Sequence, residues 1–307
     1  MRPLCRPAAS IAVSAATRIV GFPDTGIKFP LTPSGLDDSN EYLEHSDERA
    51  RNMSRVFITG STDGLGFAAA RALIDDGHEV VLHARSRERA VALADLAKKS
   101  LGIVLGDLSS SVDTHQIAEQ VNAIGRMDAV IHNAGIYRVA SRSSTTEGHA
   151  KTLAVNTLAP YILTALIERP DRLIYLSSGM HRGGRPMLRD IDWVERRWDQ
   201  TQAYSESKLY VTALALAVAR LWPDVLSNAV DPGWVPTKMG GAGATDDLDE
   251  GYLTQTWLAV SDDPAVAVSG AYWFHRQQQA PAAEASVVSF QDQLVSSLAK
   301  LTGVSMF

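Results

Sequence analysis

The sequence predicts an α/β protein in which helices cover both faces of a doubly wound parallel sheet. Two short runs rich in β-branched and aromatic residues, Val56–Thr59 and Glu79–Ala84, predict buried strands, and the helical pattern Phe67–Ile74 lies between them. A strand, a helix and a second strand within about 30 residues form the repeating unit of such a sheet. The chain has 307 residues, of which 45% are hydrophobic, and this is enough for the core of a single α/β domain.

The turn between the first strand and its helix is rich in glycine and reads TGSTDGLG from Thr59 to Gly66. Glycine permits backbone angles that are closed to other residues and lets a ligand approach the main chain. The helix behind the turn presents unpaired N–H groups and the positive end of its dipole. We therefore predict a pyrophosphate cradle here, with a tight corner that binds nothing as the alternative.

Further apolar runs and helical patterns complete the predicted architecture. The later strands are expected at Leu101–Leu105, Asp128–His132, Leu173–Leu176, Ser227–Val230 and Ser269–Phe274. Long helical patterns cover Thr145–Glu168, which Pro160 is expected to break, Tyr204–Trp222 and Glu284–Leu301.

These elements carry short motifs whose order resembles the short-chain dehydrogenase/reductase family, whose members bind a nicotinamide dinucleotide on one Rossmann-like domain. The glycine turn has the spacing TGxxxGxG, the triplet Asn133-Ala134-Gly135 follows the fourth strand, and Tyr204 and Lys208 lie one helical turn apart. A YxxxK pattern alone arises often by chance, so the resemblance depends on the whole series. It extends over residues 54–275 and is specific for the family and its chemistry, not for a substrate.

The resemblance implies NADP, with NAD less favoured. A carboxylate after the second strand would bind the adenosine ribose and favour NAD, but the sequence there reads His83-Ala84-Arg85. A guanidinium suits a 2′-phosphate because its planar fork donates two hydrogen bonds to phosphate oxygens. We expect Arg85 to hold that phosphate, and Arg87 and Arg89 to be exposed helix residues.

The family motifs also imply the other cofactor contacts. Asp107 would contact adenine, although an Asp followed by two serines is also a reasonable helix cap, and the Pro-Gly motif after the sixth strand would meet the nicotinamide. The predicted cofactor residues are Thr59, Gly60, Ser61, Asp63, Gly64, Leu65, Gly66, Arg85, Asp107, Leu108, Asn133, Ala134, Gly135, Tyr204, Lys208, Pro232, Gly233, Val235 and Thr237.

The catalytic residues implied by the resemblance are Tyr204, Lys208, Ser178 and Asn156. A phenol has an unperturbed pKa near 10, so Lys208 and the oxidised nicotinamide are expected to favour its ionised form. Ser178 would hydrogen-bond the substrate oxygen beside its structural neighbour Ser177, or the two serines exchange these roles. Asn156, an unfavourable residue inside a helix, would hold a water in a proton relay.

The expected activity is NADP(H)-dependent hydride transfer between nicotinamide and a small carbonyl or alcohol substrate, most simply reduction of a ketone or aldehyde with Tyr204 as general acid/base. A non-catalytic NADP-binding sensor or scaffold of the same fold is the alternative. The segment 179–203 between Ser178 and Tyr204 is longer than in compact family members. It resembles the branch with retinol-dehydrogenase-like enzymes and polyketide ketoreductases.

Apolar side chains of this insertion have two possible roles. They either form a substrate pocket or pack the insertion onto the body of the domain. The side chains concerned are Met180, Met187, Trp193 and Trp198, with Tyr137 and Trp234 as further candidates for the pocket. The glycine-rich and acidic segment Lys238–Gly251 is expected to be a mobile lid, or else an inert surface loop.

Composition argues against several classes of partner. A net charge of −6 argues against nucleic acid, and a single cysteine, Cys5, precludes an internal disulfide and fits a reducing, cytoplasmic compartment. The apolar stretch Ala8–Ala16 is far shorter than the roughly 20 residues that span a bilayer, so no transmembrane segment is predicted. No metal site is predicted either.

The N-terminal region is predicted to lie outside the folded domain. Residues 1–53 are expected to be a disordered leader or a mis-assigned start ahead of a domain at 54–307, with Met53 as the natural start. Residues 1–20, basic and without acids, alternatively form an organelle presequence. The family resemblance implies a homo-oligomer, because the apolar helix Tyr204–Trp222 is of the kind that pairs between subunits in this family.

Overall fold

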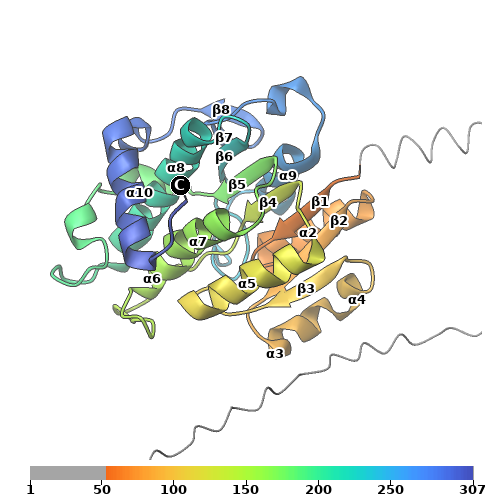
Figure 1. The fold of residues 1–307 in the computed structure, drawn as a ribbon, viewed down its shortest axis with the longest axis horizontal. Coiled ribbons are helices and arrows are strands. Elements are labelled where there is room, and N and C mark those ends of the chain that lie inside the picture. The colour runs from red at the N-terminus through yellow and green to blue at the C-terminus, as the bar shows by residue number, and fades with distance from the viewer. Residues whose placement is uncertain (1–52, 307) are drawn as a thin grey trace, which may run out of the picture. The chain divides into compact units, whose positions relative to one another are not determined.

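The computed structural model of the protein describes residues 53–306, so the expectations for residues 1–52 lie outside the described part of the chain. The described residues form a central sheet of eight strands in the order β3-β2-β1-β4-β5-β6-β7-β8, which is drawn as a ribbon in Figure 1. All neighbouring strands pair in parallel except β7 and β8, which are antiparallel. The strands are β1 (Arg55–Ile58), β2 (Glu79–Ala84), β3 (Gly102–Leu105), β4 (Ala129–His132), β5 (Arg172–Leu176), β6 (Leu226–Asp231), β7 (Tyr272–Phe274) and β8 (Gln277–Gln279).

Helices cover both faces of this sheet, as the sequence predicts, so the expected doubly wound α/β architecture is confirmed (Figure 1). Successive residues of a strand point to opposite faces, and both faces here are apolar. In β1, Phe57 packs with α5, α7 and α8, whereas Val56 and Ile58 pack with α2 and α9. The helices are α2 (Gly64–Asp75), α3 (Arg87–Ala90), α4 (Ala94–Ala97), α5 (Ser111–Ile124), α6 (Lys151–Leu153), α7 (Ala159–Leu166), α8 (Gln200–Leu221), α9 (Leu248–Val260) and α10 (Val288–Thr302).

The first six strands agree with the predicted bounds to within one residue, but the predicted helix from Thr145 is wrong at its start. That helix begins at Lys151, after a β-bridge between Ser144 and Ala150. Pro160 does not break it either. A π-helical turn, Ala154–Leu158, precedes α7, and proline is tolerated near the start of a new helical segment because the N–H that it lacks would have no partner there.

The C-terminal third differs most from the prediction. The last parallel strand is only Tyr272–Phe274, and a tight turn leads into β8, an edge strand of three glutamines with no hydrophobic alternation to reveal it. His275 and Arg276 in this turn have φ values of +46° and +60°, the left-handed pair that a two-residue hairpin favours. The acidic segment expected to be a loop contains the start of α9, which Asp247 caps through the N–H groups of Asp249 and Glu250.

Helix α8 is buried over most of its length, and a later helix of the same chain covers it. It begins at Gln200, one turn before Tyr204, and every residue from 203 to 218 is buried. Helix α10 begins at Val288 rather than Glu284 and packs along α8, where Phe290 meets Tyr210 at 6.3 Å between ring centroids. The helix surface from which a homo-oligomer was predicted is therefore already covered within one chain. Between residues 53 and 306 no helix is long and apolar enough to cross a bilayer.

Candidate active site

A cleft of about 570 Å³ lies beyond the carboxyl ends of the central strands, at β1 and β4. These two strands are parallel neighbours, and the strand order runs outward from them in opposite directions, through β2 and β3 on one side and through β5 and β6 on the other. Ligands of open α/β sheets bind at this switch of strand order. Its lining includes Ser178 and Tyr204 from the predicted catalytic set and Pro232, Gly233, Val235 and Thr237 from the predicted cofactor set. The fold therefore brings together motifs that are far apart in the sequence.

The glycine turn between β1 and α2 is packed too closely to accept larger residues. Gly60 has a φ of +69°, and a Cβ there would lie 3.0 Å from the Cβ of Ala134. A Cβ on Gly66 would lie 2.4 Å from the carbonyl oxygen of Gly60 and 2.3 Å from the Asn133 amide nitrogen. The start of α2 thus packs directly on the turn, and only glycine fits this close approach.

The Asn133-Ala134-Gly135 triplet holds this turn in place. The Asn133 side-chain amide donates a hydrogen bond to the Thr59 carbonyl at 3.0 Å, and the Ala134 N–H donates to the Thr59 hydroxyl at 3.0 Å. Gly135 is close to a predicted catalytic residue, because a Cβ there would lie 3.4 Å from Lys208 Nζ. The triplet therefore connects the glycine turn to the catalytic helix.

His83, at the end of β2, supports the glycine turn in a way that the sequence analysis did not recognise. It accepts a hydrogen bond from the Gly60 N–H at Nδ1, and its Nε2 lies 2.9 Å from the Gly106 carbonyl. Burial lowers the pKa of His83, and a neutral imidazole supplies the one acceptor and one donor that these bonds need. His83 thus ties the glycine turn to the ends of β2 and β3, and a polar residue inside a buried strand was the available signal.

Two arginines occupy the adenosine side of the site. Arg85 is exposed directly after β2, as expected for a group that meets a phosphate. Arg89, expected to be an ordinary exposed residue, instead reaches the glycine turn, where its guanidinium donates to the Thr62 hydroxyl at 3.4 Å and lies 3.6 Å from the Asp63 carboxylate. Lys238 from the loop after β6 also pairs with Asp63, and this ion pair lowers the pKa of Asp63.

Asp107 lies at the end of β3 but does not cap the following helix, so the alternative reading of this residue as a helix cap is wrong. Its carboxylate accepts hydrogen bonds from the backbone and hydroxyl of Ser109, at 2.9 Å and 2.8 Å. The cap of α5 is Ser110, whose hydroxyl accepts from the Asp113 N–H at 3.2 Å. The side-chain bonds of Asp107 close a short turn at the sheet edge.

Tyr204 lies at the floor of the cleft with only 6% of its surface exposed. Burial raises its pKa to about 12, a hydrogen bond with Ser178 acts in the opposite direction, and the Asp231 carboxylate raises the pKa further. The net shift is therefore upward, opposite to the shift expected from Lys208 alone. The Tyr137 ring stands against Tyr204 at 4.6 Å between centroids.

The two serines after β5 have different surroundings. Ser177 is buried, and its hydroxyl lies 2.6 Å from that of Thr212 on α8. Ser178 lines the cleft and hydrogen-bonds the phenol of Tyr204. Of the two roles considered for these neighbours, the geometry therefore fits Ser178 beside the reacting group and Ser177 as the structural residue.

Lys208 and Asn156 connect the catalytic helix to the sheet. Lys208 donates to the Leu176 carbonyl at 2.7 Å, its nitrogen lies 5.6 Å from the centre of the Tyr204 ring, and burial lowers its pKa to about 8. Asn156 lies in the π-helical turn, accepts from the Ile136 N–H at 2.8 Å and donates to the Ser207 hydroxyl at 3.0 Å. These bonds join the loop after β4 to α8 between its Tyr and its Lys.

The Pro-Gly motif forms the opposite wall of the cleft. Gly233 has a φ of +82° and donates to the Asp231 carboxylate at 3.0 Å. The Tyr272 hydroxyl donates to the second oxygen of the same carboxylate at 3.0 Å. The methyl group of Thr237 lies 3.2 Å from the Cβ position of Gly64, so the two predicted cofactor loops touch.

A protein-family model described as enoyl-(acyl carrier protein) reductase matches residues 60–266. A short-chain dehydrogenase of Penicillium rubens is 40% identical over 258 residues, which is 83% of this chain and 99% of the relative. The chain belongs to the short-chain dehydrogenase/reductase family. It is thus a member of a family of oxidoreductases that act on alcohol and carbonyl groups.

Two further comparisons place this short-chain dehydrogenase/reductase among its relatives. A candidate daunorubicin C-13 ketoreductase of Streptomyces sp. (strain C5) is 32% identical over 235 residues, 71% of this chain and 82% of the relative. The crystal structure of a blue fluorescent protein from a metagenomic library, in complex with NADPH, has a TM-score of 0.60 at 22% identity and covers 73% of this chain and 96% of that one. The latter similarity concerns the fold.

In this reductase-family chain the tryptophans of the insertion pack it onto the body instead of lining the cleft. Trp193 and Trp198 meet edge to face at 5.6 Å, and the Arg196 guanidinium lies 3.8 Å from the centre of the Trp193 ring. Arg196 also donates two hydrogen bonds of 2.9 Å to Glu206, which is fully buried on α8 beside Tyr204. Of the residues proposed for a pocket, those in the cleft lining are Met180, Tyr137 and Trp234.

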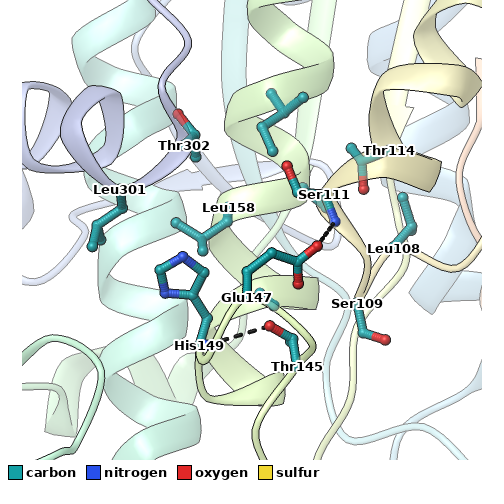
Figure 2. A pocket seen from close by; sticks show the side chains of 13 residues that line it. Leu108, Ser109, Ser111, Thr114, Thr145, Glu147, His149, Leu158, Leu301 and Thr302 are labelled. Atoms are coloured by element: carbon teal, nitrogen blue, oxygen red, sulfur yellow. Dashed lines mark hydrogen bonds between the residues drawn. The ribbon is translucent and has the colours of Figure 1, made fainter.

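A second, smaller cavity of about 180 Å³ lies apart from the cleft (Figure 2). Leu108 faces it from the end of β3, and Glu147 and His149 face it from the loop before α6. His149 lies 2.6 Å from the Asp192 carboxylate, and this hydrogen bond raises the pKa of His149. Of the predicted site residues, this cavity includes only Leu108.

Proposed function

We propose that this protein is an NADP(H)-dependent reductase of ketones or aldehydes in which Tyr204 is the general acid. The observation that carries the proposal is the position of Tyr204. Its buried phenol lies at the floor of a 570 Å³ cleft, hydrogen-bonded to Ser178, with Lys208 one helical turn away. This is the arrangement that protonates a carbonyl oxygen while a hydride reaches the adjacent carbon.

The residues at the glycine turn fit a dinucleotide. A Cβ on Gly60, Gly64 or Gly66 would meet neighbouring protein atoms at 3.2 Å or less, so the close packing of the turn requires glycine, and the N-terminus of α2 at this turn offers N–H groups to a phosphate. NADPH bound there would supply the hydride. Arg85 has no carboxylate partner among the described residues, which supports a role with the 2′-phosphate, and the structural neighbour that binds NADPH supports the choice of cofactor.

The chain's own residues account for the proton. Because the pKa of Tyr204 is raised to about 12, the phenol keeps its proton at neutral pH and acts as donor. As charge develops on the substrate oxygen, the phenol donates its proton and the Ser178 hydroxyl hydrogen-bonds that oxygen. Lys208, which is held by its hydrogen bond to the Leu176 carbonyl, would bind the nicotinamide ribose, and Asn156 holds the loop after β4 against α8, where a water relay would begin.

The direction proposed is reduction. An NADP preference favours it in a cell, and the name of the Streptomyces relative describes a ketoreductase. A raised Tyr204 pKa also favours the protonated donor over the phenolate that alcohol oxidation requires.

The cofactor assignment is tested by titrating the protein with NADPH and with NADH while following cofactor fluorescence. We expect NADPH to bind at least roughly 10-fold more tightly, and Arg85→Ala to remove most of that difference without weakening NADH, because a charge-assisted bond to phosphate is lost. Arg87→Ala, from the same exposed segment, is the matched control. Equal affinity for both cofactors in the wild type would contradict the NADP assignment.

The catalytic assignment is tested with Tyr204→Phe and a panel of aryl ketones and aldehydes. We expect kcat to fall by roughly 10²- to 10⁴-fold while NADPH affinity stays unchanged, since the phenylalanine keeps the ring and removes only the proton donor. Consumption of NADPH gives the rate. A variant that retains wild-type kcat would show that Tyr204 is not the acid.

A further inference from the structure

The outer part of the cleft is apolar and open. Trp234 and Met239, from the loop after β6, line it with 52% and 36% of their surfaces exposed, and Met180 and Phe274 line it as well. Large apolar side chains left exposed within a concave surface indicate a ligand with an apolar body. This wall therefore favours a bulky apolar ligand, but apolar contacts alone do not orient that ligand.

Arg138 is the basic residue that lines the cleft among the described residues, and it has no carboxylate partner among them. The acids of the cleft are already engaged. Asp231 accepts from Tyr272 and Gly233, and Asp246 accepts from the Trp234 N–H at 2.7 Å. The guanidinium of Arg138 is thus available to a ligand, whereas the carboxylates are held by the protein.

The backbone of Arg138 is held in a conformation that a non-glycine residue seldom adopts. Its φ is +58°, a left-handed value that is strained for a residue with a Cβ, and such residues cluster at ligand sites. The guanidinium carbon lies 5.9 Å from the centre of the Tyr137 ring, and its nitrogens lie 3.9 Å from the Cβ position of Gly241 on the opposite wall. Arg138 therefore reaches across the mouth of the cleft.

Tyr204, Tyr137 and Arg138 form a series from the floor of the cleft to its mouth. The two rings are 4.6 Å apart, and the guanidinium follows beyond the second ring. A ligand whose carbonyl meets Tyr204 would place a ring beside Tyr137 and its far end beside Arg138. A guanidinium at that position matches a planar anion such as a carboxylate, which accepts two parallel hydrogen bonds.

We propose that the substrate is an apolar, ring-bearing ketone or aldehyde that carries an anionic group, and that Arg138 binds this group at the cleft mouth. The proposal rests on the carbonyl reductase function proposed above. It makes Arg138 a specificity-determining residue of the substrate side, separate from the arginines near the adenosine side.

The test compares two ligands of matched shape, 4-acetylbenzoate and its neutral amide 4-acetylbenzamide, by calorimetry with the full chain in the presence of saturating NADP⁺. We expect the carboxylate to bind roughly 10-fold more tightly or better, because a hydrogen bond to a charged group is replaced by a neutral one in the amide. In Arg138→Gln the affinity for 4-acetylbenzoate is expected to fall to the affinity for 4-acetylbenzamide. The affinity for the amide is expected to stay unchanged. Arg189→Gln, which makes the same charge change at an exposed position of the insertion, is expected to change neither.

Equal affinity of the two ligands in the wild type, no detectable binding of the carboxylate, or an equal loss of both in Arg138→Gln would overturn the anion site. Turnover is measured separately with NADPH in place of NADP⁺. Reduction of both ketones without discrimination rejects the anion site and leaves the reductase function standing. Discrimination in binding without any reduction supports the anion site and rejects the reductase function.

Discussion

The two walls of the cleft are built in different ways. The cofactor wall consists of the glycine turn and the Asn133-Ala134-Gly135 triplet, where neighbouring backbones touch and each residue is tied to its neighbours by short hydrogen bonds. The substrate wall consists of loop residues that stay exposed, such as Arg138, Trp234 and Met239. The first wall tolerates little change in residue volume, and the second is held mainly through backbone contacts.

This difference explains why motifs identify the family and leave the substrate undetermined. A close backbone approach restricts the residue type at each position, so the same pattern serves for every member. An exposed loop restricts almost nothing by packing, so its side chains are free to differ with the ligand. Substitutions on the cofactor wall should therefore change stability and cofactor binding, whereas substitutions on the substrate wall should change substrate selectivity.

The largest effect is expected for Gly66→Ala on the cofactor wall. The added methyl group would lie 2.4 Å from the Gly60 carbonyl oxygen and 2.3 Å from the Asn133 amide, and neither can move without breaking the turn. We expect a loss of about 3 kcal/mol or more in the free energy of unfolding and no measurable NADPH binding. Urea unfolding and cofactor titration measure the two quantities.

Gly183→Ala is the matched control for this substitution, because no atom lies within 4 Å of its Cβ position. It is expected to change the free energy of unfolding by less than about 0.5 kcal/mol. An alanine at 66 that is as well tolerated as one at 183 would show that the cofactor wall is not closely packed.

The next effect in size is expected for Arg196→Met, which separates the insertion from α8. The substitution leaves the Glu206 carboxylate fully buried without its partner, and breaking such a pair costs about 3 kcal/mol. Arg196→Met combined with Glu206→Gln should recover part of the loss, because the buried Glu206 charge is then removed and the Asp190 carboxylate, which also pairs with Arg196, keeps its backbone hydrogen bonds. Thermal unfolding of both variants checks this, and a double variant less stable than the single one would contradict it.

A smaller effect, confined to substrate kinetics, is expected for Trp234→Ala on the substrate wall. The indole is 52% exposed, so its loss should alter the free energy of unfolding by less than about 1 kcal/mol. For a bulky ketone the apolar contact is lost, and kcat/KM should fall roughly 10-fold with NADPH affinity unchanged. Steady-state kinetics with a small and a bulky ketone distinguishes this from a general loss of activity, which would lower both alike.

The smallest effect is expected for Asp231→Asn, between the two walls. The Asp231 charge raises the pKa values of both Tyr204 and Lys208, so its removal lowers both. Loss of the proton donor then begins at lower pH. The pH at which the reduction rate falls on the alkaline side should therefore decrease by less than about one unit. Tyr272→Phe removes a hydrogen bond to the same carboxylate but keeps its charge, and should not lower that pH. A pH–rate profile that moves equally in both variants would contradict an electrostatic role for Asp231.

The sequence by itself determined the fold class, the first six strands and the family, and it singled out Ser178, Tyr204 and the Pro-Gly motif, which the structure brings together at the cleft. These follow from local requirements, because a strand needs its apolar run, a tight turn needs glycine, and a Tyr and a Lys four residues apart share a helix face. Where the local signal was absent or ambiguous, prediction failed, as for the glutamines of β8 and the start of α6.

Only the tertiary structure decided which distant segments meet. It placed Arg89 and Lys238 on Asp63, His83 between the glycine turn and β3, α10 over α8, and Arg138 at the mouth of the cleft. Each of these depends on the separation and direction of elements many residues apart. A local sequence pattern reflects the steric requirements of the backbone within one turn or one helix. Contacts between distant segments form only when the whole sheet and its helices are assembled.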